Sequence, residues 1–97
     1  MPTREQLIRE AAEKEMLAST FTRYARDLAA TFDGIPARPG DSEPYWKGPA
    51  AERYLADAVR LRREMNDLEN SCLATADTLR RRAELLRKEA AQVPNSA

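Results

Sequence analysis

The chain of 97 residues carries 16 basic and 16 acidic side chains, no histidine and one cysteine. A chain without net charge gives little support to strong phosphate-driven binding of nucleic acid, and a single cysteine excludes an internal disulfide. Without histidine, a glycine-rich phosphate loop or metal-ligand spacing, the sequence predicts no enzyme, no catalytic residue, no cofactor and no metal site.

A first helix is predicted over residues 4–32. The stretch "TREQ", from Thr3 to Gln6, is typical of a capping box in which Thr3 is the N-cap. Apolar residues then recur at alternating steps of three and four, which is the spacing of one helical face. This row comprises Leu7, Ala11, Ala18, Phe21, Ala25, Leu28 and Phe32, and Lys14 interrupts it.

A proline-rich loop is predicted over residues 33–49, because its four prolines lack the amide proton that a helix interior needs. A second helix is predicted over residues 50–90. Gly48 followed by Pro49 suits the N-cap and the first helical position, where the missing proline N–H costs nothing. Residues 91–97 are predicted to form a disordered tail.

The second helix shows the same three-four spacing over five heptads. Its predicted inner row comprises Ala51, Tyr54, Ala58, Leu61, Met65, Leu68, Cys72, Thr75, Leu79, Arg82 and Leu86. Cys72 is expected to be a small buried hydrophobic residue. Lys14 and Arg82 are expected to lie at an edge of the bundle or to pair between chains, because an unpaired buried charge is costly.

These patterns predict an all-α fold: one domain over residues 1–97, an antiparallel two-helix hairpin that pairs into a four-helix bundle dimer. A hairpin buries one side of each helix, so a second set of apolar residues would stay exposed in a single chain. Contiguous exposed apolar surface of this kind usually marks an interface. The predicted dimer interface comprises Ile8, Ala12, Leu17, Leu55, Val59, Leu73, Ala76 and Ala83.

The stretch "YWKGPAAERY" places a Trp-x-Gly in the turn of this hairpin and an aromatic residue eight positions after the tryptophan. With the chain length and the two helices, it resembles the WXG family, the early-secreted-antigen-like substrates of bacterial type VII (ESX) secretion systems. The resemblance implies that Trp46, Gly48 and Tyr54 form a recognition turn. It also implies export as a folded homodimer, or as a heterodimer with a related WXG-like protein.

In that family the Trp-x-Gly turn acts together with a C-terminal Tyr-x-x-x-Asp/Glu. Here the residue four positions after each tyrosine is Leu28, Pro49 or Ala58, so the partner would have to supply that half of the signal. The loop is also longer than the tight turn usual in the family.

The resemblance therefore implies a protein made in the bacterial cytoplasm, with no cleaved signal peptide and no membrane span, that the type VII machinery secretes as a substrate or escort. The alternative is an intracellular helical chaperone or adaptor for a larger type VII toxin. A third class, a nucleic-acid-binding hairpin, would use arginine runs such as Arg80–Arg82. Because acidic residues interleave with these runs at helical spacing, a solvated helix face is the favoured interpretation.

Overall fold

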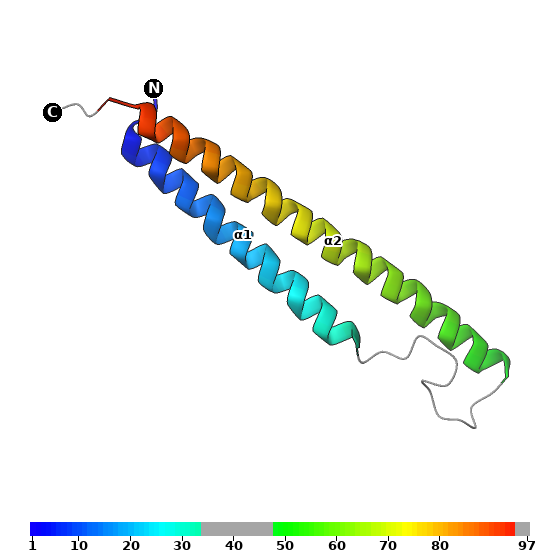
Figure 1. Cartoon of the computed structure of the whole chain (residues 1–97). Helices are drawn as coiled ribbons and strands as arrows, with labels where there is room; N and C mark the ends of the chain where they lie inside the picture. The colour runs from blue at the N-terminus through cyan, green and yellow to red at the C-terminus, as the bar shows by residue number, and fades with distance from the viewer. Residues whose placement is uncertain (34–47, 95–97) are drawn as a thin grey trace.

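The chain folds into two long helices that run antiparallel, side by side (Figure 1). The computed structural model describes residues 1–33 and 48–94, and of Phe32 only the backbone. Helix α1 spans Arg4–Asp33 and helix α2 spans Pro49–Gln92, with 30 and 44 residues. No strand occurs within the described ranges, so the predicted all-α hairpin is confirmed.

The observed helix bounds lie within two residues of the predicted ones. Residues 91 and 92 continue α2, so the prediction that the disordered tail begins at residue 91 is wrong. Most of the predicted loop, residues 34–47, and the last three residues of the predicted tail lie outside the described ranges.

The first turn of α1 is closed by the predicted capping box. The Thr3 amide donates to Gln6 Oε1 at 2.8 Å, and the Gln6 amide donates to Thr3 Oγ1 at 3.1 Å. These reciprocal bonds satisfy two backbone donors that a helix start otherwise leaves without partners.

The seam between the helices is built mainly from alanine. One alanine row lies on each helix, at a spacing of seven residues, and no member is more than 2% exposed. The two rows are Ala11, Ala18 and Ala25 on α1, and Ala76, Ala83 and Ala90 on α2. Small side chains let helix axes approach closely. Leu7 is the one large aliphatic residue in the buried set of the described chain, at 2% exposure.

Part of the predicted inner row of α2 points away from this seam. Ala51, Ala58 and Cys72 are buried as predicted. Tyr54, Leu61 and Leu68 are 41%, 37% and 41% exposed, and Thr75 and Arg82 are exposed as well. The cause is the alanine row of α2: when it faces the alanine row of α1, the neighbouring row that holds the leucines is turned to the outside.

The molecule is a thin rod with principal extents of 77 × 15 × 13 Å and a radius of gyration of 21.9 Å. A compact domain of this length would have a radius of gyration near 13 Å. The accessible surface is 7593 Å², against about 5,600 Å² for a compact protein of the same mass. Helix α2 also extends beyond the last residue of α1 (Figure 1). The fold therefore leaves much more surface exposed than a globular domain does.

Candidate interaction surface

The predicted recognition turn is only partly described. Trp46 lies outside the described residues, whereas Gly48 and Tyr54 lie inside them. Gly48 is the N-cap of α2 and has φ 109° and ψ −177°. Its carbonyl accepts the first helical bond, from the Glu52 amide at 3.0 Å. This backbone conformation is essentially restricted to glycine, so the turn needs a glycine at this position for its own geometry.

We expect Gly48→Ala to lower the free energy of unfolding by about 1–3 kcal/mol, which is the cost of holding a non-glycine residue in this region. A Cβ atom built at Gly48 would meet no other atom within 4 Å, so the cost comes from the backbone and not from a clash. Urea denaturation followed by circular dichroism would measure it. A chain made by chemical ligation with D-alanine at this position is the matched control and should keep wild-type stability, because D-residues favour positive φ. An equal loss of unfolding free energy in the L-alanine and D-alanine chains would contradict this explanation.

One broad face of the hairpin is marked by polar contacts between the helices. Arg80 donates to Thr22 Oγ1 at 2.8 Å, and Arg87 makes a two-pronged ion pair with Glu15, in which Nε donates to Oε2 at 3.2 Å. We call this the ion-pair face. By heptad spacing it also carries three apolar residues that are 39–40% exposed: Ile8, Val59 and Leu73.

The opposite broad face begins at a shallow groove near the ends of the chain. Glu10 and Lys14 of α1 and Arg82, Leu85, Leu86 and Glu89 of α2 line it. Lys14 is half-buried there and pairs with Glu10, with Nζ 3.7 Å from Oε1. Heptad steps from Glu10 and from Arg82 reach five exposed apolar residues on the same side, the last of which is Tyr54. We call the other four the leucine face: Leu17, Tyr24, Leu61 and Leu68.

The Glu15–Arg87 ion pair gives the ion-pair face a dependence on pH. The hydrogen bond from Arg87, with its positive charge, lowers the pKa of Glu15 below its ordinary value, and the same contact raises the pKa of Arg87. A lowered carboxyl pKa means that the folded state binds the proton less tightly than the unfolded chain. The pair therefore stabilises the fold above the unfolded pKa of glutamate, about 4.3, and this contribution is lost as the pH falls through the lower folded value.

We expect the wild-type melting temperature to fall slightly more than that of Arg87→Met on acidification below about pH 4.3. The difference should be small and should shrink in salt, because both groups are exposed to solvent. Thermal unfolding at a series of pH values measures it. Lys88→Met removes a neighbouring charge and is the control. An identical pH profile for wild type and Arg87→Met, at low salt, would contradict the assignment.

The structure separates the predicted interface residues into three groups. Ile8, Leu17, Val59 and Leu73 are exposed at 39% or more, and Ala12 is exposed too. Leu55 is half-buried. Ala76 and Ala83 are 0% exposed within a single chain, so the prediction that they remain open for a partner is wrong. They belong to the seam, where their small size allows the helices to pack closely.

The sequence interpretation missed the leucine face as a whole. The predicted dimer interface included Leu17 but not Tyr24, and Leu61 and Leu68 were predicted to lie in the inner row of α2. The signal that could have found this face is the matching heptad spacing of alanine on the two helices, which indicates the row that makes the closest contact.

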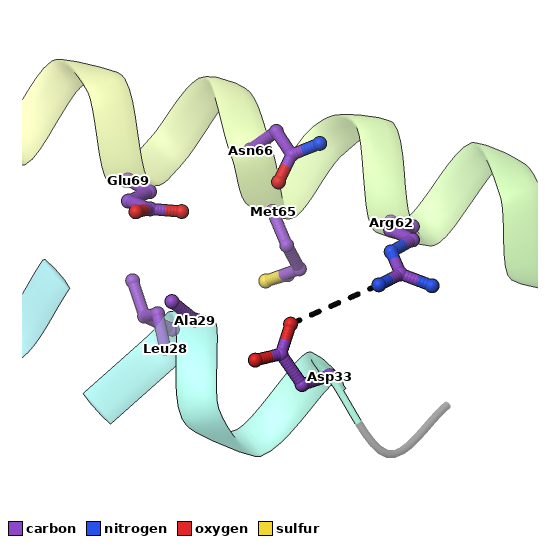
Figure 2. Close-up of a pocket in the computed structure, with 7 residues that line it drawn as sticks. All are labelled: Leu28, Ala29, Asp33, Arg62, Met65, Asn66 and Glu69. Carbon is purple, nitrogen blue, oxygen red and sulfur yellow. Dashed lines mark ion pairs between the residues drawn. The ribbon is translucent and has the colours of Figure 1, made fainter. Parts of the chain in front are cut away.

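A small cavity of about 170 Å³ lies where α1 ends beside α2 (Figure 2). In it Asp33 Oδ1 faces Arg62, 3.8 Å from a guanidinium nitrogen, and the Met65 side chain extends toward α1. The remaining lining residues are Leu28, Ala29, Asn66 and Glu69. Nowhere in the described ranges do three His, Cys, Asp or Glu residues form a group that could hold a metal ion. The cavity thus lies at the end of the seam, beside the exposed ion pair of Asp33 with Arg62.

Neither α1 nor α2 has an apolar stretch long enough to cross a bilayer. Comparison with protein-family models, curated proteins and solved structures finds no match to this chain.

Proposed function

We propose that this chain is a small WXG-like protein, exported as a folded dimer by a bacterial type VII secretion system, in which it acts as a substrate or escort and not as an enzyme. The observation that carries the proposal is the position of Gly48. It follows Trp46 by two residues, caps α2 in a conformation restricted to glycine, and lies at the turn end of an antiparallel hairpin.

The exposed surface supports pairing with another chain. The accessible area exceeds that of a compact protein of equal mass by about 2,000 Å², and large apolar residues lie exposed on both broad faces. A standard interface covers about 800 Å² of each partner. The hairpin therefore has ample surface for a second hairpin, whether a second copy or a related protein.

The proposal is tested by export of a Trp46→Ala variant from the bacterium that encodes the chain. We expect the wild type in both the cell lysate and the culture medium, and the variant at wild-type level in the lysate but absent from the medium. Tyr45→Ala, which changes the neighbouring aromatic residue outside the Trp-x-Gly, is the control and should be exported. Circular dichroism of the purified variants shows whether each is folded. A folded Trp46→Ala chain that is exported normally would exclude the turn as a signal.

The alternative, an intracellular chaperone or adaptor for a larger type VII toxin, is favoured by one observation. No tyrosine of this chain is followed four positions later by an acidic residue. This alternative expects the wild type to remain in the lysate, bound to the helical N-terminal part of such a toxin. A chain found free in the medium would exclude it.

A further inference from the structure

The contact between the two helices changes in character toward the turn. In the half of the rod farther from the turn, Ala76, Ala83 and Ala90 form one heptad row of α2, and each is at most 2% exposed. The same row continues toward the turn with Glu69 and Arg62, and both of these are only half-buried. The closely packed alanine row therefore ends at Ala76, and charged residues take its place.

Buried side chains are also missing from the turn end of the seam. Among the described side chains of α1, none after Ala25 is buried, and on α2 none of residues 59–71 is buried. Ala58 is buried, but it lies four residues farther toward the turn than Arg62, which faces Asp33 at the end of α1. Where the last two turns of α1 lie beside α2, the described seam thus has no buried residue.

The cavity of about 170 Å³ lies in this part of the seam (Figure 2). Leu28 and Ala29 of α1 and Met65 of α2 border it, so these apolar side chains do not fill the space between the helices. The half-buried Glu69 lines it as well and has no ion pair or hydrogen bond within the described residues. Partial burial of an unpaired carboxylate opposes close packing of the helices at this point.

Polar contacts also hold the two halves unequally. The two contacts that mark the ion-pair face both lie in the half farther from the turn. At the turn end, Asp33 and Arg62 are 3.8 Å apart and the Asp33 side chain is 79% exposed, and exposed pairs of this kind contribute little to stability. Asp33 also places a negative charge in the last turn of α1, which has no basic residue. This charge is unfavourable at the C-terminal end of a helix dipole.

We infer that residues 26–33, the last two turns of α1, form a detachable end that separates from α2 as a unit while the alanine seam stays closed. A helical segment this short does not persist alone in water, so the detachable end loses its helical structure when it separates. The opening uncovers Met65 and releases Asp33 from Arg62. A protein that binds the turn end of the rod can then draw this segment away without separating the rest of the helices. The inference concerns the chain alone and goes beyond the proposed export, so its test needs no secretion system.

Hydrogen exchange of individual backbone amides, followed by NMR on the full chain at one fixed concentration, measures the opening. We expect the amides of residues 28–33 to exchange roughly 100-fold or more faster than those of residues 18–25, after correction for intrinsic rates. Residues 28–33 should share one free energy of opening and one dependence on urea, weaker than that of residues 18–25, because they open together and expose less surface. Protection that falls residue by residue toward Asp33 would indicate simple fraying and overturn the inference, as would equal protection in both ranges.

Variants on the facing helix separate detachment from fraying, because fraying of α1 does not involve α2. Glu69→Leu places an apolar side chain of similar size at the border of the cavity, and it should slow the exchange of residues 28–33 roughly tenfold. Glu64→Leu makes the same change at an exposed position of α2 and should leave these rates unchanged. Equal exchange rates of residues 28–33 in the two variants would overturn the inference.

A variant within the detachable end tests the opposite direction. Leu28→Ala removes apolar contact beside the cavity and should speed the exchange of residues 28–33 roughly threefold or more, while residues 11–25 keep their wild-type rates. Met16→Ala, at a position of α1 that is 71% exposed, is the control and should change neither range. Circular dichroism shows whether both variants are folded. A Leu28→Ala effect that spreads equally over both ranges would mean that α1 opens only as a whole, and it would overturn the inference.

Discussion

Leu7→Ala is expected to destabilise the hairpin more than any other truncation of an aliphatic side chain in the described residues. Leu7 is 2% exposed, and the rest of the buried set consists of alanines and Cys72. Truncating a buried leucine costs about 2–5 kcal/mol. We expect a value near the lower end, about 2–3 kcal/mol, because the first turn of α1 can partly close over the gap. This is a large share of the roughly 5–15 kcal/mol that stabilises a typical domain.

The measurement is thermal unfolding by circular dichroism at one fixed protein concentration, since binding between chains would otherwise shift the midpoint. A loss of this size should lower the melting temperature by about 8 °C or more. Leu85→Ala is the matched control, because Leu85 is 63% exposed and its truncation removes little buried area. A Leu7→Ala variant that melts together with Leu85→Ala would show that Leu7 does not contribute to the core in solution.

The helix bounds could be predicted from the sequence because the signals that set them are local. Thr3 and Gln6 form their capping box within a single turn. Gly48 and Pro49 begin α2 for reasons that involve only their own backbone. The end of α2 has a weaker signal: Val93 is extended and Pro94 follows it, and the predicted end fell two residues short. Helix ends without a glycine cap commonly vary by this amount.

The rotation of α2 about its axis could not be predicted in the same way. Two neighbouring rows of α2 both repeat every seven residues, one with Leu61 and Leu68 and the other with Ala76 and Ala83. Hydrophobicity favours the leucine row for the seam, and close packing against the alanines of α1 favours the other. This choice depends on both helices together, so the pattern of α2 alone does not determine it.

The residues of the candidate surface also divide into those that local sequence predicts and those that depend on how the two helices pack. The role of Gly48 as an N-cap followed from its place before a proline. The leucine face required the rotation of α2, because only that rotation shows that Leu61 and Leu68 are exposed and do not pack in the seam. Trp46 lies outside the described residues, so its role depends on the export experiment.

The alanine seam leads to the second large expected effect, from a substitution that adds apolar volume. Ala83 is 0% exposed and lies level with about residue 19 of α1, next to the equally buried Ala18. Ala83→Leu adds three carbon atoms at a fully buried position of the seam. Overpacking of this kind costs about 1–3 kcal/mol. The helices must separate, and the neighbouring seam alanines then lose contacts as well.

Ala74→Leu is the control for Ala83→Leu, because Ala74 lies on the same helix but is exposed. Alanine and leucine differ little in helix propensity, so Ala74→Leu should melt like the wild type, while Ala83→Leu should melt at least about 4 °C lower. The two outcomes separate two explanations of the exposed leucines. If Ala83→Leu is destabilised, close alanine packing holds Leu61 and Leu68 outside, where a partner can reach them. If it is as stable as the wild type, the seam tolerates a leucine row, and α2 is free to turn its leucines inward when no partner is bound.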